Sequence, residues 1–283
     1  MYTPTHQPKR TLSRRRFLQL SAVAGTGLLG TLAAMLPRVS AVPQALAGTI
    51  PGPTYSEAPM LADLVTRGQL PPVDQRLPTV PGVIPTIESA GKYGDRIRRL
   101  HRGRADRFGL TKIIDHGLAW FDHDLTMRPH IAEAWEVNAD ATVWTFMLRA
   151  GMKWSDGEPF TTADIHWWYD NELTNVEITP NPPERFTTGD TLMQIEVIDA
   201  QTVKFRFADP YPLFVQRIAR LDNAIYAPSH YLAHFHMATT ADQTALQQEY
   251  EQAGFTNWVD YYNDRNTWYL NPAKPSLAPW LAK

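Results

Sequence analysis

The sequence of 283 residues predicts a mixed α/β fold, in which antiparallel hairpins lie beside helices. Two segments, 134–149 and 193–207, alternate apolar and polar side chains with the period of a β-strand, and turn residues interrupt each of them. Between and after them, apolar residues recur at helical spacing behind helix-start signals. With 43% hydrophobic and 11% aromatic residues, the chain can bury a core that fills one large domain or two small ones.

Residues 1–47 predict a targeting segment, because they hold six basic residues and no acidic one, with an apolar stretch from Phe17 to about Leu36. The run "SRRRFLQ" is similar to the twin-arginine export signature, which is read by a translocase that carries folded proteins. Its motif residues are Arg14, Arg15, Phe17 and Leu18. The small residues Ala45 and Ala47 predict cleavage after Ala47, with 39–41 as the alternative site.

A permanent transmembrane helix is the alternative for this segment, since the apolar stretch approaches the roughly 20 residues that span a bilayer, although its glycines weaken that interpretation. Because the sequence has no cysteine, we expect neither disulfides nor a lipid anchor on a cysteine. The expected location is therefore the periplasm, with the mature protein free of the membrane.

Without residues 1–47 the chain holds 21 basic and 29 acidic residues, a formal charge of −8, so nucleic acid is not an expected partner. Residues 48–91 are rich in proline, which fixes φ and cannot donate a backbone hydrogen bond. We therefore expect an arm that runs extended over a surface, with one short helix near Met60–Arg67. A simple linker is the alternative.

The following elements are predicted in chain order. A short strand at Arg96–Leu100 leads into the loop "HRGRADRFG", and Ile113–Phe121 forms a second apolar piece. Ala134–Val137 pairs with Thr142–Arg149 across a turn at Asn138–Asp140.

A helix then begins at Thr161, where Asp164 completes a capping box and Ile165, Trp168 and Tyr169 point inward. The second hairpin pairs two predicted strands. The first carries Met193, Ile195 and Val197 on one face, and the returning strand carries Val203, Phe205 and Phe207. The last predicted helices span Leu213–Leu221, Ser229–Phe235, Ala241–Ala253 and Trp258–Tyr262.

The stretch "RPHIAEAWEVNADATVWTFMLRAGMKWSDGEPFTTADIHWWYD" strongly resembles the extracytoplasmic solute-binding proteins of family 5, the peptide and oligopeptide receptors of ABC importers. The resemblance covers at least Lys92–Leu221, and its most specific piece is Leu148–Asp164. The segments "EAPMLADLVTRGQLPPVDQRLP" and "AGFTNWVDYYNDRNTW" look like one large-bodied branch of that family.

The resemblance implies a fold of the type II periplasmic binding protein kind, in which two lobes close over a ligand. Residues 92–283 would be the N-terminal part of the solute-binding domain, and 129–180 an extra domain remote from the ligand. Family members are considerably longer, and this sequence stops about where the second lobe should start. The expected fold is therefore incomplete: a first lobe plus the extra domain, with the second lobe missing.

The loop after the first predicted strand sits where the family usually presents groups to its ligand. A peptide needs charged partners for its termini and aromatic surface for its side chains. The candidate ligand-binding residues are Arg104, Asp106, Arg107, Phe108 and Trp120. An ordinary solvated loop, and a core position for Trp120, are the alternatives.

His230, His234 and His236 suggest a metal site, because His230 and His234 have the spacing of a helical zinc pair. However, Tyr231 stands where a zincin has glutamate, and no acidic ligand is near in sequence. We therefore expect no metal and surface or partly packed histidines, and the same applies to Asp122–Asp124. No phosphate loop, nucleophile elbow or paired carboxylates appear, so we expect neither an enzyme nor a cofactor.

The resulting hypothesis is a non-catalytic periplasmic receptor that captures peptides or other small solutes for an ABC permease. We expect it to be a monomer, with the twin-arginine translocase as its partner during export. Two alternatives stay open: a gene fragment that folds poorly without its second lobe, and an exported enzyme.

Overall fold

The computed structural model describes residues 55–84, 86, 88, 89, 91–94, 97, 98, 116–219 and 225–278. All of these residues belong to one compact unit, Pro53–Lys283. Several predicted residues lie outside the described ranges: the signal motif, Ala45, Ala47, Arg104, Asp106, Arg107 and Phe108. Of the strand predicted at Arg96–Leu100, only Ile97 and Arg98 are described, and neither lies in a strand.

A four-stranded antiparallel sheet forms the centre of the described unit. Its order is β3 (Ala132–Val137), β4 (Val143–Leu148), β8 (Thr202–Arg206) and β7 (Gln194–Val197). Both predicted hairpins are confirmed, and the sheet joins them by pairing β4 with β8. Side chains along β4 alternate between half-buried and buried, as its sequence period predicts.

The turn between β3 and β4 is held by its own polar side chains. Asn138 Oδ1 accepts a hydrogen bond from the Val143 amide (2.9 Å), and Asp140 Oδ1 accepts one from the Thr142 amide (3.1 Å). Ala141 adopts a φ of 57°, in the left-handed region. Asparagine and aspartate favour such turns because their side chains bond nearby backbone groups.

The predicted capping box at the start of α5 (Thr162–Trp168) is present. Thr161 Oγ1 accepts from the Ala163 amide (3.2 Å), and Asp164 Oδ2 accepts from the Thr161 amide (3.0 Å). The helix continues into a single π-turn, η1 (Tyr169–Leu173), which the sequence did not predict. Ile165 and Trp168 are buried and Tyr169 packs against the core, as predicted.

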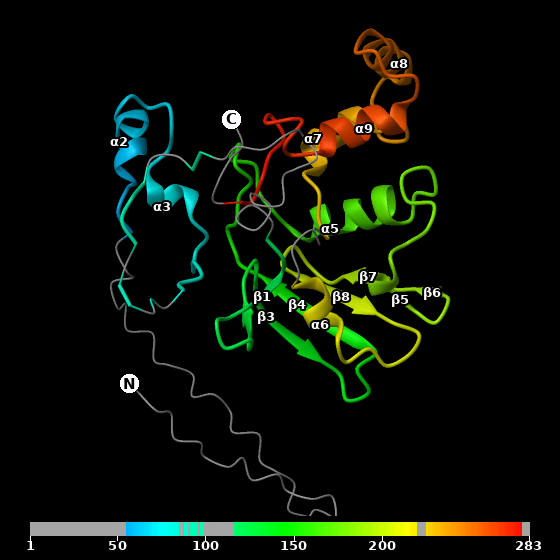
Figure 1. Cartoon of the computed structure of the whole chain (residues 1–283), viewed down its shortest axis with the longest axis horizontal. Helices are drawn as coiled ribbons and strands as arrows, with labels where there is room; N and C mark the ends of the chain where they lie inside the picture. The colour runs from blue at the N-terminus through cyan, green and yellow to red at the C-terminus, as the bar shows by residue number, and fades with distance from the viewer. Residues whose placement is uncertain are drawn as a thin grey trace, which may run out of the picture. The chain divides into compact units, whose positions relative to one another are not determined.

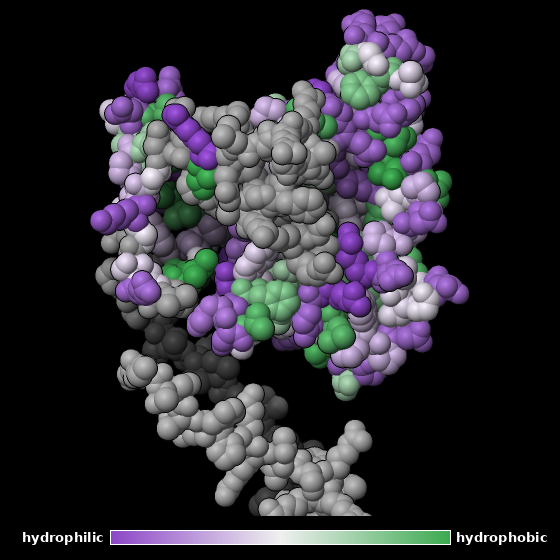
Figure 2. Space-filling model, in the orientation of Figure 1, coloured by the Kyte–Doolittle hydropathy of each residue, from purple (hydrophilic) through white to green (hydrophobic). Residues whose placement is uncertain are grey.

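The remaining helices lie close to their predicted places. They are α6 (Phe214–Ile218), α7 (Ser229–Leu232) with the 3₁₀ turn η3 (Ala233–Phe235), α8 (Gln243–Gln252) and α9 (Trp258–Asn266). α5 lies next to the sheet, and α7 and α9 lie beyond it (Figure 1). The visible surface of α8 is mainly hydrophilic (Figure 2), in keeping with Leu246 as its single buried residue.

A second, smaller hairpin precedes the sheet and positions the candidate ligand-binding site. β1 (Ala119–Phe121) pairs with β2 (Met127–Pro129), and Trp120 lies opposite Arg128. Asp122 donates its amide to the Thr126 carbonyl (2.8 Å) to close the turn. The other short elements are η2 (Glu184–Phe186), β5 (Thr187–Thr188) and β6 (Thr191–Leu192).

Aromatic rings form a large part of the described core. Phe146 of β4, Phe205 of β8 and Phe214 of α6 meet with centroids 5.4–6.3 Å apart. Separately, Trp154 and Phe160 of the "WSDGEPFT" stretch pack edge to face at 5.5 Å, and both are buried. These aromatic contacts supply packing beyond their apolar area.

The proline-rich arm carries two short helices, α2 (Pro59–Thr66) and α3 (Val73–Arg76), where the sequence predicted one. Beyond α3 the arm is tied to the end of β4. The Thr79 amide donates to the Ala150 carbonyl (2.9 Å), and the Arg149 guanidinium donates to the Val80 carbonyl (3.1 Å). These bonds hold residues 79 and 80 against the end of β4.

Within the described ranges, every helix is too short or too polar to cross a bilayer.

Candidate ligand-binding site

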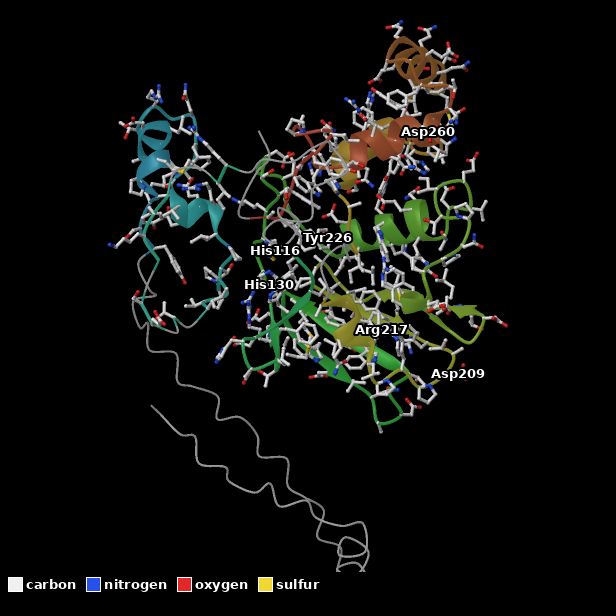
Figure 3. All side chains as sticks on the ribbon, in the orientation of Figure 1. His116, His130, Asp209, Arg217, Tyr226 and Asp260 are labelled. Carbon is white, nitrogen blue, oxygen red and sulfur yellow. The ribbon has the colours of Figure 1, made fainter. Side chains whose placement is uncertain are left out.

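Two histidines and a tryptophan come together on the β1–β2 hairpin. His116 precedes β1, Trp120 lies within it, and His130 follows β2 (Figure 3). His116 Nδ1 is in contact with His130 Nε2, and their rings stack with centroids 4.7 Å apart. The Trp120 ring lies 5.6 Å from that of His130 and 6.0 Å from that of His116. We refer to His116, Trp120, Arg128 and His130 as the histidine cluster.

The backbone of the cluster is fixed from three directions. The Tyr226 hydroxyl donates to the His116 carbonyl (2.6 Å), and the His130 amide donates to the Leu118 carbonyl (3.1 Å). Arg149 Nε donates to the His130 carbonyl (2.9 Å). Arg149 directly follows β4 and also donates a hydrogen bond to the Val80 carbonyl of the arm. This one residue therefore links the arm, the end of β4 and the histidine cluster.

The surroundings of His130 disfavour its protonated form. Burial, together with the positive charges of His116, Arg128 and Arg149, lowers the pKa of His130 to about 4. At neutral pH His130 is therefore an uncharged imidazole, which can accept a proton or bond a polar ligand.

Among the predicted site residues, Trp120 is therefore placed by the structure in a polar aromatic cluster, half-buried. Arg104, Asp106, Arg107 and Phe108 lie outside the described residues. Sequence reasoning missed His116, Arg128 and His130. No spacing signal marks them, because the register of β1 with β2 brings them together rather than a helical or metal-binding period.

The three later histidines are separated, each with partners of its own. His230 Nε2 lies 2.8 Å from Asp156 Oδ2, and His234 Nε2 lies 2.8 Å from Glu249 Oε2. Asp156 lies 74 residues from His230, and Glu249 lies 15 residues from His234. The sequence next to the histidines therefore shows neither acid. The expected surface or partly packed position is wrong for His236, which is buried against Trp258 and Tyr262.

In the part of the chain that the structure describes, no group of three His, Cys, Asp or Glu side chains is arranged to hold a metal ion. His123 pairs with Asp122 on the exposed β1–β2 turn (Nδ1–Oδ1 3.0 Å). The hydrogen bond that His123 donates to the Asp122 carboxylate raises the pKa of His123. This pair is a solvated turn contact.

A buried carboxyl group joins η1 to α9. Glu172 Oε1 accepts hydrogen bonds from the Tyr262 hydroxyl (2.6 Å) and from Asn266 Nδ2 (3.0 Å). Burial raises the pKa of Glu172, which these hydrogen bonds and the charge of Lys274 oppose. Since both partners of Oε1 belong to α9, we interpret Glu172 as part of the packing between η1 and α9.

A depression of about 490 Å³ lies beside α5, between that helix and the turn after β7. Trp167 and Val197 contribute apolar surface to it, and Asp170 and Asp199 contribute carboxylates. Asp170 pairs with His166 (2.8 Å). The depression lies within or beside the segment that the family resemblance implies is remote from the ligand.

The model of the family "Bacterial extracellular solute-binding proteins, family 5 Middle" matches residues 126–273. This match covers more than half of the chain, and the chain belongs to that family. The chain has part of the α/β fold of the periplasmic binding proteins, and similarity to a solved structure confirms this prediction.

Two solved structures share the fold across most of this chain. An oligopeptide-binding protein OppA is 38% identical and superposes with a TM-score of 0.75, covering 81% of this chain and 36% of its own. The periplasmic binding protein MelB from Agrobacterium fabrum C58, solved in complex with stachyose, is 23% identical with a TM-score of 0.60, and it supports the fold alone.

Curated relatives match over shorter stretches. The periplasmic alpha-galactoside-binding protein of Rhizobium meliloti (strain 1021) is 28% identical over 172 residues, which are 52% of this chain and 24% of that protein. The glutathione-binding protein GsiB of Escherichia coli (strain K12) is 26% identical over 120 residues, 42% of this chain and 23% of that protein. The matched region thus spans about a quarter of the length of these relatives.

Proposed function

We propose that this chain is the N-terminal portion of a periplasmic solute-binding component of an ABC importer, which captures small peptides without catalysis and delivers them to a permease. The observation that carries the proposal is the 38% identity to an oligopeptide-binding protein across 81% of this chain. Membership of the solute-binding family supports the transport role. The relatives named for an alpha-galactoside and for glutathione make other solutes the competing ligand class.

The proposed ligand surface includes the histidine cluster and the predicted loop residues Arg104, Asp106, Arg107 and Phe108. Trp120 supplies a half-buried ring against which an apolar peptide side chain can pack. The loop follows the first predicted strand and ends at Gly109, seven residues before His116, so both features belong to one stretch of chain. In this proposal a second lobe closes over the ligand from the opposite side.

Export is the second part of the proposal. The residues Arg14, Arg15, Phe17 and Leu18 would direct the folded chain to the twin-arginine translocase, and cleavage after Ala47 would release it into the periplasm. The periplasmic location is supported by the relative that is named as a periplasmic protein. We propose a monomeric receptor whose macromolecular partners are the permease subunits.

The ligand proposal is tested by calorimetry on the full gene product purified from its host. Tri- and tetrapeptides, glutathione and an α-galactoside are titrated separately. We expect saturable binding of peptides, and Trp120→Ala should weaken it about tenfold or more because a buried aromatic anchor is lost. Trp268→Ala, a half-buried tryptophan after α9, is the matched control.

The alternatives give different results in the same titration. Binding of the α-galactoside alone would show that the peptide class is wrong. If none of the probes binds to a folded protein, the chain is not a receptor for these solutes, and the gene-fragment hypothesis is favoured.

A further inference from the structure

The guanidinium Nε of Arg128 is buried, and it has no hydrogen-bond acceptor among the described residues. A buried donor left unpaired costs about 1–3 kcal/mol, so a folded protein usually supplies an acceptor. Because Arg128 lies opposite Trp120 in the β1–β2 ladder, that acceptor would sit beside the Trp120 ring and the two histidines.

The charges that act on His130 have one sign. The groups whose charge acts on His130 are His116, Arg128 of β2 and Arg149 after β4, and all three are cationic or become so on protonation. Arg149 is already engaged by the His130 and Val80 carbonyls. A cluster of cationic groups of this kind attracts an anion.

The neighbouring polar groups among the described residues are engaged with partners of their own. Asp122 in the β1–β2 turn is within electrostatic range of Arg128, but its Oδ1 already accepts from the His123 amide (2.8 Å) and lies 3.0 Å from His123 Nδ1. The Tyr226 hydroxyl, from the segment before α7, is engaged with the His116 carbonyl.

We propose that Arg128, His116 and His130 form a binding site for an oxyanion group, the carboxylate of a bound solute or a free phosphate ion, with Trp120 beside it. Guanidinium and imidazolium groups bind carboxylate and phosphate through charge-assisted hydrogen bonds. The solute form of this inference rests on the proposed receptor function, whereas binding of the free ion does not.

The stacked histidines make the site sensitive to protons. An anion beside His130 favours the protonated imidazole and so raises its pKa from about 4. Binding is then accompanied by proton uptake, and by linkage the affinity for the anion rises as the pH falls from 8 towards 5.

The test follows the histidine ring protons of the full chain by NMR at constant ionic strength. Sodium acetate and inorganic phosphate are titrated separately, and each titration is repeated at several pH values. We expect a saturable shift of the His130 signal, assigned with His130→Asn, and an upward move of its titration midpoint. Arg128→Gln should reduce the affinity at least tenfold.

The control is Arg206→Gln, because Arg206 is an exposed arginine on β8 paired with Glu196, outside the cluster. It should leave the shift unchanged. Circular dichroism and thermal unfolding establish that each variant is folded. The proposal is overturned if neither anion shifts His130 saturably, or if folded Arg128→Gln responds like the parent chain.

Peptides separate the two sources of the oxyanion. A peptide that shifts His130 with a free C-terminal carboxylate but not as its amide identifies the solute carboxylate, and a response to phosphate alone identifies the free ion. If peptides bind in calorimetry and His130 responds to no anion, the site is wrong and the receptor function stands. If acetate or phosphate shifts His130 and no solute binds, the site stands and the receptor function is wrong.

Discussion

At the scale of the residue, the packing of the cluster depends on a glycine. A Cβ atom at Gly117 would lie 2.7 Å from the Ile218 carbonyl oxygen, closer than real Cβ contacts. That oxygen is backbone at the end of α6, so it cannot move aside as a side chain would. Gly117 therefore allows the chain between His116 and β1 to lie against α6.

We expect Gly117→Ala to lower the free energy of unfolding by about 1–3 kcal/mol, because the added methyl group forces the backbone apart. Urea denaturation of the purified protein measures the change. Gly91→Ala is the control, since a Cβ there meets no atom within 4 Å. Equal effects of the two substitutions would show that the close approach is absent.

His130 predicts a pH dependence of stability. Its pKa in the folded chain, about 4, is below its unfolded value, so its contribution is fully present above about pH 6.5 and is lost as the pH falls towards 4. Partial exposure limits the loss to about 1–2 kcal/mol. Denaturation of His130→Gln in chloride buffers should show a shallower decline between pH 6.5 and 4 than the parent chain. Parallel curves would contradict the prediction.

At the scale of the element, one buried carboxylate of the capping box also connects α5 to two other segments. Asp164 is 3% exposed and accepts hydrogen bonds from the Thr161 amide, from Trp154 Nε1 (3.3 Å) and from Ser229 Oγ (2.9 Å). It thus joins the start of α5 to the "WSDGEPFT" turn and to α7. The capping box in the sequence predicted only the first of these bonds.

We expect Asp164→Ala to cost about 3 kcal/mol or more, since it leaves several buried donors unpaired. Thr161→Ala removes one cap bond and should cost about 1 kcal/mol. Chemical denaturation of both variants gives the comparison. If the two costs are equal, Asp164 acts only as a cap.

At the scale of the whole molecule, the N-terminal motif predicts the export route. Replacing Arg14 and Arg15 together by lysine should retain the chain in the cytoplasm, because the translocase reads the paired arginines. Arg38→Lys, outside the motif, is the control. Cell fractionation followed by intact mass measurement gives the location and both ends of the mature chain. A periplasmic double variant would show that another route exports it.

Local rules predicted much of the described fold. Both hairpins and the start of α5 were predicted from alternation, turn residues and a capping box, all of which involve near neighbours in sequence. The end of α9 was placed too early at Tyr262. The helix continues to Asn266, whose side chain bonds Glu172 from η1, and this partner is 94 residues away.

The sequence by itself determined the α/β class, the two hairpins and the family resemblance, because strand period, caps and turns are set by residues a few positions apart. Only the tertiary structure decided that His116 meets His130, that Arg128 lies opposite Trp120, and that Asp156 and Glu249 take separate histidines. These pairings depend on strand register and on how distant elements pack, and such contacts leave no periodic signal in the chain.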